Sequence, residues 1–239
     1  MTGKNPAPRA YEAVLHSIEA ELRSGSLKLG DQLPGERALA ERHGLSRASV
    51  RDAIRILDVL GVVRTSTGSG PNAGAVIVSR PAAGLAAALR LHIATRQLSV
   101  AEIVQTRILL ETGAAEAAVI DPGRPATRAK LDEAAGLLER MDDPRLGRAD
   151  FHALDARFHV LLSSLAGNAV IEAMMESIRM SISDYVAESI RSDEVWEPVA
   201  EVLRGQHHGI LAAFSAGDGR RAARLLREHI EWFHAETQG

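Results

Sequence analysis

The chain has 239 residues, with 28 lysines and arginines against 31 aspartates and glutamates, a formal net charge of -3. This length allows one large domain or two modest ones, and 46% hydrophobic with 25% charged residues excludes disordered and fibrous proteins. Cysteine is absent, which excludes disulfides, thiolate nucleophiles and cysteine-based zinc sites. No secretory signal and no run of about 18 apolar residues occurs, so we expect a cytoplasmic protein with no membrane partner.

The charge is divided unevenly along the chain. Residues 1–80 carry 11 basic and 8 acidic residues, a net of +3, whereas residues 81–239 carry 17 and 23, a net of -6. Pro81 ends any preceding strand, and a long helical pattern follows it. We therefore expect two domains, 1–80 and 81–239, of which the first faces nucleic acid.

The first domain is expected to hold three short helices and a β-hairpin. Gly44 suits the end of one helix, and Ser46 has the chemistry to cap the start of the next. Residues 62–65 and 75–78 are β-forming segments around a long turn rich in Gly, Ser and Asn. Apolar spacing places the three helices at 11–24, 36–43 and 47–60. Two short helices followed by a hairpin outline a winged helix-turn-helix.

The helix that starts after Ser46 has the composition of a DNA-reading helix. Arg47 and Arg51 could each make a bidentate contact with guanine, and free backbone N–H groups with Ser46 could bind phosphate. The alternative is that these arginines are solvated and form salt bridges with nearby acids: Glu41, Asp52 or Asp58.

The run from Leu29 to Leu60 strongly resembles the DNA-binding domain of GntR-type bacterial transcription regulators, without a gap. Gly35 departs from the family where a serine cap is common, and Ala48 where a hydroxyl residue is common. The hairpin tip also looks longer than usual. The resemblance implies operator contacts from Arg37, Ser46, Arg47, Ser49 and Arg51, with Gly68 and Gly70 of the wing at the minor groove.

The second domain shows no strand pattern. A plausible capping box joins Ser99 to Glu102. Seven periodic segments predict an all-α bundle, which makes the whole chain mainly α. The segments lie near 82–96, 99–120, 124–141, 147–166, 168–191, 195–216 and 218–236.

Histidines are concentrated late in the chain, with six of nine between His152 and His234. Asp155 and His159 are four residues apart and share a helix face, and two further histidines lie on inward-facing stripes: His207 and His229. One carboxylate and three imidazoles suit a divalent metal such as zinc, nickel or manganese. The alternative is that each is an ordinary core histidine with a local hydrogen bond. His152 and His234 are expected outside the ligand set.

The same region, over nearly all of residues 82–236, resembles the all-helical FCD effector domain of the FadR-like branch of that family. Short motifs carry the resemblance: Arg107 with Glu111, Asp155 with His159, Gly167-Asn168, Gln206-His207 and His229. The resemblance implies that a metal is held by Asp155, His159, His207 and His229. Zinc is our first choice, with nickel and manganese as alternatives, because the same ligands accept all three.

Arg107 is the candidate effector-binding residue. It lies amid Ile103, Leu110 and Ala114 on an otherwise apolar face and so needs an anionic partner. That partner is either Glu111, one turn away, or the carboxylate of a bound metabolite, as the family suggests. Four protein ligands leave one or two positions on an octahedral metal where a small carboxylate fits.

These observations favour a metabolite-responsive regulator that binds a palindromic operator on double-stranded DNA as a homodimer, with a small organic acid as effector. Two alternatives remain open: a metal-free regulator that binds an acyl thioester, and a metal-dependent hydrolase. We expect that the protein is not an enzyme, because Glu111 is the only candidate general base near the proposed metal ligands. The effector, the operator and the direction of regulation are not specified by the sequence.

Overall fold

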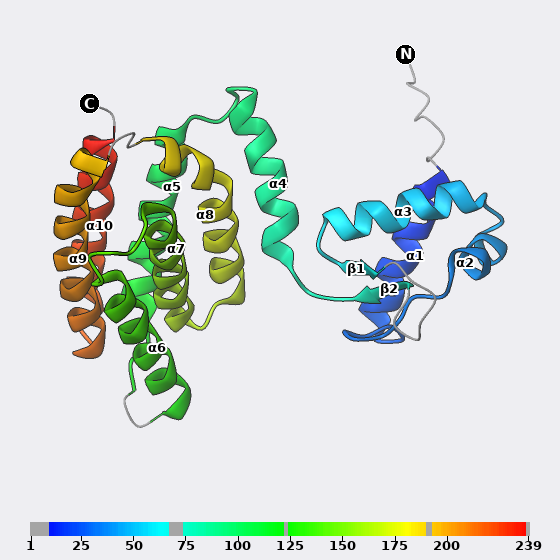
Figure 1. Ribbon diagram of the computed structural model, residues 1–239. Helices are drawn as coiled ribbons and strands as arrows, with labels where there is room; N and C mark the ends of the chain where they lie inside the picture. Colours follow the sequence, from blue (N-terminus) through cyan, green and yellow to red (C-terminus); the bar gives the residue numbers. More distant parts are fainter. Residues whose placement is uncertain (1–9, 67–73, 122–123, 190–192, 238–239) are drawn as a thin grey trace, which may run out of the picture. The chain divides into compact units, whose positions relative to one another are not determined.

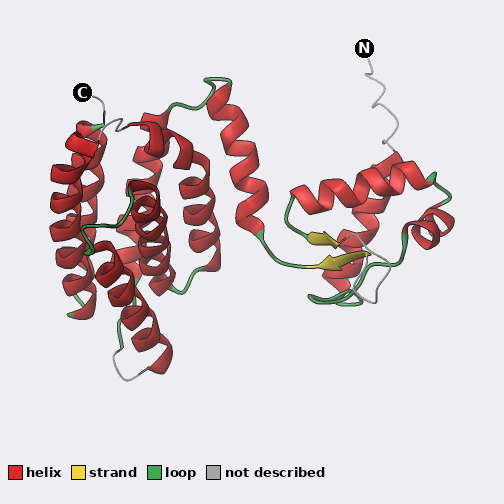
Figure 2. Cartoon of the chain, in the orientation of Figure 1, coloured by secondary structure: helices red, strands yellow, loops and turns green. Residues whose placement is uncertain are grey.

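The chain is almost entirely helical, with one small hairpin (Figures 1 and 2). Its contacts divide it into two compact units, Met1–Leu85 and Ala86–Gly239. The predicted mainly α fold, a winged helix-turn-helix followed by an all-α bundle, is confirmed. In the part of the chain that is described, no helix is long and apolar enough to cross a membrane. The computed structural model describes residues 10–66, 74–121, 124–189 and 193–237.

The N-terminal unit packs three helices and a hairpin around one apolar core. Its elements are α1 (Ala10–Ser24), α2 (Glu36–His43), α3 (Arg47–Val59), β1 (Val63–Ser66) and β2 (Gly74–Ile77). The hydrophobic stripes of the helices meet in this core, together with Val63 and Ile77 from the strands. The strands pair antiparallel, with Val63 opposite Ile77 and Ser66 opposite Gly74.

The ends of α2 and α3 follow from the capping residues of the sequence. Gly44 adopts a left-handed conformation with φ 63° and ends α2. Ser46 Oγ then accepts a hydrogen bond of 3.1 Å from the backbone N–H of Ser49 and caps α3. Gly61, just after α3, has φ 72°, and a Cβ there would lie 2.1 Å from the carbonyl oxygen of Arg80. Both turns of the N-terminal unit therefore depend on these residue types.

Seven α-helices and one 3₁₀ turn follow among the described residues; the first helix crosses the boundary between the two units, and the other six belong to the C-terminal unit. The helices are α4 (Pro81–Ala94), α5 (Val100–Ala117), α6 (Pro125–Met141), α7 (Arg148–Ser163), α8 (Ala169–Ser189), α9 (Asp193–Ser215) and α10 (Gly219–Glu236). The predicted helix over 147–166 ends earlier, at Ser163, and continues as the 3₁₀ turn η1 (Ser164–Ala166). Ser164 Oγ bonds to the carbonyl of Leu161 there, and Gly167 in a left-handed conformation closes the turn.

Aromatic side chains fill the core of the bundle. Phe151 and Phe158 of α7 pack with Trp196 and Phe214 of α9, and all four are almost completely buried. Helix α10 lies against both α5 and α9. At its first residue, Gly219, a Cβ would lie 2.5 Å from the carbonyl oxygen of Ala115 on α5, so the two backbones touch. The arrangement brings α5, α7, α8, α9 and α10 around one polar cluster.

Candidate functional site

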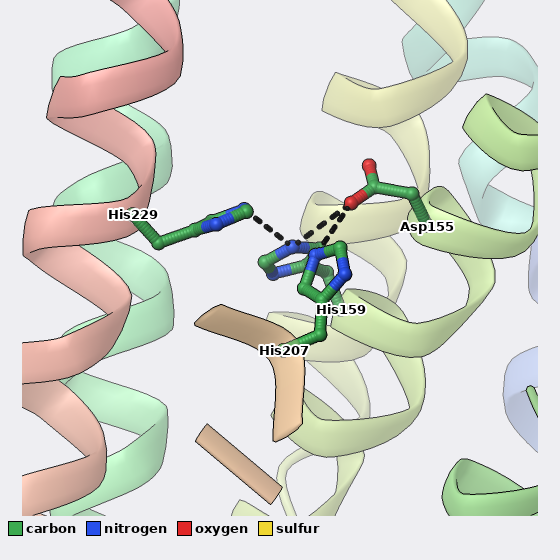
Figure 3. A group of neighbouring side chains, drawn as sticks. All are labelled: Asp155, His159, His207 and His229. Atoms are coloured by element: carbon green, nitrogen blue, oxygen red, sulfur yellow. Dashed lines mark hydrogen bonds and ion pairs between the residues drawn. The ribbon is translucent and has the colours of Figure 1, made fainter. Parts of the chain in front are cut away.

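The four predicted metal ligands meet in the core of the C-terminal unit (Figure 3). Asp155 and His159 project from one face of α7, because they are one helical turn apart. His207 reaches the same point from α9, and His229 from α10. One donor atom from each residue lies within 4.8 Å of the others, and the three histidines are buried. Their convergence, which spacing alone could not establish, is a property of the fold.

The distances between the donor atoms match those around a metal ion. His207 Nε2 lies 3.0 Å, and His159 Nε2 3.4 Å, from Asp155 Oδ1. The Nε2 atoms of His159 and His229 are 3.2 Å apart. Bonds of about 2.1 Å place neighbouring ligands about 3.0 Å apart in an octahedron and about 3.4 Å apart in a tetrahedron. These three separations are therefore of the size found between neighbouring ligands of one ion, and all four donor atoms lie within 4.8 Å of one another.

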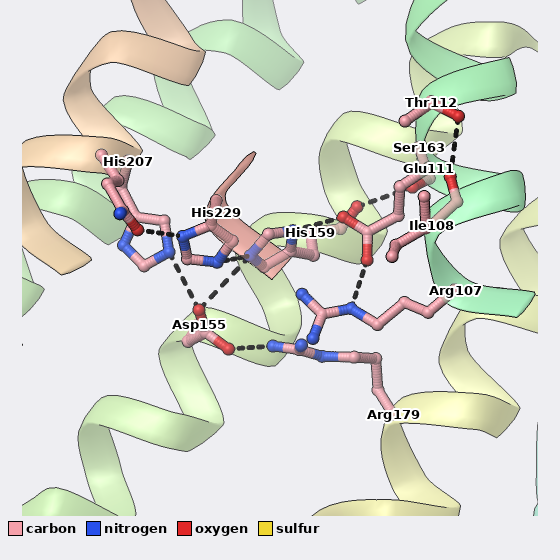
Figure 4. Close-up of polar contacts among 11 residues, drawn as sticks. Arg107, Ile108, Glu111, Thr112, Asp155, His159, Ser163, Arg179, His207 and His229 are labelled. Atoms are coloured by element: carbon pink, nitrogen blue, oxygen red, sulfur yellow. Dashed lines mark hydrogen bonds and ion pairs between the residues drawn. The ribbon is translucent and has the colours of Figure 1, made fainter. Parts of the chain in front are cut away.

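Outer hydrogen bonds orient two of the imidazoles (Figure 4). His159 Nδ1–H donates to Glu111 Oε2 at 2.5 Å, and His229 Nδ1–H donates to Gln206 Oε1 at 2.8 Å. These donations leave lone pairs on both Nε2 atoms, which face each other. Two lone pairs at that distance repel unless a proton or a cation lies between them. This pattern of outer acceptors and inner lone pairs is typical of metal-bound histidines.

His207 provides a second observation that fits a metal. Its side chain is fully buried, and neither ring nitrogen has a hydrogen-bond partner among the described residues. Nε2 is close to Asp155 Oδ1, yet outside hydrogen-bonding geometry. An unpaired polar group in a protein core costs about 1–3 kcal/mol. The lack of a hydrogen bond to Nε2 is explained if that nitrogen is a metal ligand. The four residues therefore fit the metal that the family resemblance implies.

Buried charges set the protonation of the cluster. Burial raises the pKa of Asp155, but Arg179 and His159 outweigh it and hold that pKa well below its usual value. Burial likewise opposes the effect of Arg107 and His159 on Glu111, whose pKa is lowered to about 2. Both carboxylates are therefore ionised at neutral pH.

The pKa values of two of the histidine ligands are also lowered, which for an imidazole favours the neutral form. Burial lowers the pKa of His207, and burial together with the other imidazoles lowers the pKa of His229 further. Both rings are therefore neutral at physiological pH. Neutral imidazole with ionised carboxylate is the state in which these residues bind a metal.

Arg107 is buried and bonded to Glu111, the nearer of the two partners considered from the sequence (Figure 4). Its Nη2 atom is nevertheless buried without a hydrogen-bond partner in the described structure. Arg179 on α8 bonds to Asp155 and is also buried. Sequence reasoning missed Arg179 and gave Gln206 no role. For Arg179 a signal existed, since it interrupts an apolar face of α8 as Arg107 interrupts one on α5.

A cavity of about 650 Å³ opens beside the cluster. Arg107, Asp155, Arg179 and His229 all line it. Its size is that of a small-molecule site, and basic groups at one end suit an anion. His152 also lines it and has a pKa lowered by burial.

Among the described residues predicted to contact DNA, Ser49 is half-buried and the others are exposed: Arg37, Ser46, Arg47 and Arg51. Arg51 pairs with Glu36 at 3.0 Å and Arg47 approaches the same carboxylate at 3.9 Å, while Arg37 is 3.9 Å from Glu41. These pairs are exposed, so water screens them and phosphate can replace the acid. Ser46 and Ser49 are joined by the cap of α3. Gly68 and Gly70 lie outside the described residues.

Two family models match the chain. Residues 10–71 match the bacterial regulatory proteins of the gntR family, and residues 102–231, more than half of the chain, match the FCD domain. This chain belongs to the GntR family. The GntR and FCD resemblances of the sequence are confirmed, whereas membership of the FadR-like branch stays a prediction.

This GntR regulator is similar along most of its length to curated regulators. The Uxu operon regulator of Haemophilus influenzae is 24% identical over 232 residues, which cover 95% of this chain and 82% of that protein. The HTH-type transcriptional regulator LutR of Bacillus subtilis is 28% identical over 219 residues, covering 87% and 92%. The Streptococcus agalactiae GntR structure aligns with a TM-score of 0.60 at 20% identity, covering 95% and 98%. The chain is thus a DNA-binding transcription regulator with an FCD effector domain, and the hydrolase hypothesis is set aside.

Proposed function

We propose that this GntR regulator binds a palindromic operator as a homodimer and changes its DNA affinity when a small organic acid binds a metal-assisted site. The observation that carries the proposal is the meeting of Asp155, His159, His207 and His229 beside a cavity that Arg107 lines. We assign operator reading to residues 1–80, and effector binding with dimerisation to residues 81–239.

Asp155 and the three histidines would hold the ion. A bound divalent cation supplies positive charge that attracts a carboxylate in a cavity poor in water. Zinc is our first choice, with nickel and manganese as alternatives. The protein's own part is to keep the imidazoles neutral and oriented, through Glu111 and Gln206.

Arg107 is proposed to bind the effector carboxylate. Its Nε bonds to Glu111, which leaves Nη2 as an open donor among the cavity's described lining residues. A guanidinium donates to carboxylates in a fixed geometry, so it can orient the acid as well as attract it. An effector changes DNA affinity only through unequal binding to two arrangements of the protein.

On the DNA side, the start of α3 is proposed to enter the major groove. Arg47 and Arg51 would read bases, and Ser46, Ser49 and Arg37 would contact the backbone, with Gly68 and Gly70 of the wing at the minor groove. One such module reads few base pairs, so specific binding requires two modules on a two-fold symmetric site.

Metal content tests the sensing half of the proposal. We expect the full chain, purified without chelator, to contain about one transition-metal ion per protomer by elemental analysis. His207→Ala should abolish this content, whereas His208→Ala should retain it, because His208 is exposed and bonds to Asp142. A metal-free protein that also takes up no zinc, nickel or manganese on reconstitution would contradict the proposal.

Footprinting tests the DNA half. A short two-fold symmetric protected site upstream of the regulator's own gene is the expected result. Arg51→Ala should weaken operator binding about tenfold or more, while Arg23→Ala on α1, an equal loss of charge, should change it little. Sequence-independent binding, or equal effects of the two substitutions, would count against this assignment.

A further inference from the structure

The cavity beside the cluster has walls of unequal chemistry. Charged groups gather where Arg107, Asp155 and Arg179 line it, whereas much of the remaining lining is carbon. We propose that the effector is a compact monocarboxylate with an apolar, ring-sized body and one further hydrogen-bonding group, which His152 binds. This inference rests on the proposed effector site and names the class of acid that it takes.

Helix α7 supplies an apolar wall. Ala149, Ala153, Ala156 and Val160 recur at helical spacing, so they share one face, and all four line the cavity. An alanine side chain is a single methyl group, which leaves room for a ligand and offers it no donor or acceptor. Apolar side chains of other helices add to the lining: Met180, Ile182, Leu203 and Phe233.

Most polar groups of the lining already have partners or face solvent. Arg179 bonds to Asp155, and Ser183 Oγ donates to a backbone carbonyl. Two buried lining atoms have no hydrogen-bond partner among the described residues, Arg107 Nη2 and His152 Nε2. A ligand therefore meets two open hydrogen-bonding positions besides the metal cluster. The remaining charged residues of the lining are exposed: Arg90, Arg157 and Glu176.

His152 is held by ring packing rather than by hydrogen bonds of its Nε2. Its ring centroid lies 4.8 Å from that of Trp196 and 6.1 Å from that of Phe233. It precedes Asp155 by three residues on α7, so the two side chains share a helix face, and both line the cavity. A fixed imidazole with an open nitrogen suits one ligand hydroxyl or carbonyl, whereas the alanine face offers a hydroxyl neither donor nor acceptor.

Calorimetric titration of the zinc-loaded full chain tests the inference. The probes are benzoate, the three monohydroxybenzoates, glucuronate and galacturonate. We expect at least one monohydroxybenzoate to bind about tenfold tighter than benzoate, because its hydroxyl reaches His152. Both should bind at least about tenfold tighter than the two uronates, whose several hydroxyls would replace apolar contact with the carbon lining.

Substitution of His152 separates its hydrogen bond from its packing. His152→Phe keeps an aromatic ring against Trp196 and should reduce the preference for the best monohydroxybenzoate over benzoate, both measured in that variant, to about onefold. His152→Gln keeps a hydrogen-bonding group and should preserve part of the preference. His208→Phe, at an exposed position of α9, is the control and should change neither affinity.

The possible failures are distinguishable. Uronates that bind as tightly as the benzoates overturn the inference, and loss of their binding in Arg107→Gln would leave the effector site itself standing. A preference unchanged in both His152→Phe and His152→Gln overturns the role of His152. If none of these acids binds the zinc-loaded chain, the inference fails, whereas the proposed function is decided separately by the metal content and the footprint.

Discussion

At the scale of single residues, surroundings rather than residue type decide what a histidine does. His207 and His208 are neighbours on α9, yet the first is buried with Nε2 3.0 Å from Asp155 Oδ1, and the second is exposed and bonded to Asp142. Hydrogen-bond acceptors outside the cluster also determine the tautomer of two histidines. Glu111 and Gln206 fix which nitrogen of two other histidines faces the cluster.

Glu111→Gln should lower zinc affinity about 10–100-fold, although it removes no metal ligand. The reason is that an amide accepts the Nδ1–H of His159 more weakly than a carboxylate does. Competition with a chromophoric chelator measures the affinity. Glu116→Gln, at an exposed position of the same helix, should leave it unchanged. Equal affinities for all three proteins would show that His159 is oriented without Glu111.

Arg179→Met should destabilise the metal-free protein at neutral pH by about 3–5 kcal/mol, because it leaves Asp155 buried without its cation. In the native protein the pKa of Asp155 is lower than in the unfolded chain, and this difference stabilises the fold. The stabilisation is complete at pH values above the unfolded-state pKa. It is lost as the pH falls through the folded-state pKa. The substitution removes much of that contribution.

Urea unfolding with and without zinc measures the effect of Arg179→Met. Zinc should restore part of the lost free energy, since the ion also neutralises Asp155. Arg224→Met, at an exposed arginine of α10, is the control and should be nearly neutral. An equal deficit with and without zinc would contradict this account.

The candidate ligands could be predicted from the sequence, but their meeting could not. Spacing along α7 places Asp155 and His159 on one face, and stripes place His207 and His229 inward. Whether three helices turn those stripes toward one point depends on packing between segments far apart in the chain. The roles of Arg179 and Gln206 were missed for the same reason: each depends on a partner on another helix.

At the scale of elements, periodicity and capping residues predicted the helices closely. Gly44 and Ser46 define the ends of α2 and α3 because their roles are local. The predicted helix over 147–166 was too long, since three residues beyond Ser163 form a 3₁₀ turn that preserves the same apolar spacing over a short stretch.

Gly61→Ala should destabilise the N-terminal unit more than Gly44→Ala does. Both residues have a left-handed backbone, which costs an alanine about 1–2 kcal/mol. A Cβ at residue 61 would also clash with the backbone of Arg80, whereas one at residue 44 would meet open space. Scanning calorimetry of the full chain measures the difference, and equal shifts for the two variants would show that the backbone yields at Arg80.

At the scale of the whole molecule, the net charge of -3 combines two units with opposite charge and different tasks. All four candidate ligands and the cavity belong to Ala86–Gly239, and the helix proposed to read DNA belongs to Met1–Leu85. A ligand that binds only the folded state stabilises the unit that holds it.

Metal removal should therefore act unequally on the two units. Zinc at about 100 times its dissociation constant should stabilise the C-terminal unit by about 2.7 kcal/mol, and a chelator should reverse this. The melting transition of the N-terminal unit should move much less. Scanning calorimetry of the full chain, with calcium as a control ion that prefers oxygen ligands, measures both. A larger shift in the N-terminal unit would contradict the placement of the site.

The backbone contact between Gly219 and Ala115 has a consequence for the genetics of this regulator. Any larger residue at 219 would push the start of α10 away from α5, and the helix would carry His229 with it as a rigid rod. Alleles that still bind the operator but no longer respond to the effector should therefore arise at codon 219 as well as at the codons of the candidate ligands. Such a variant would not respond to its effector, although residue 219 lies outside the proposed metal and effector sites.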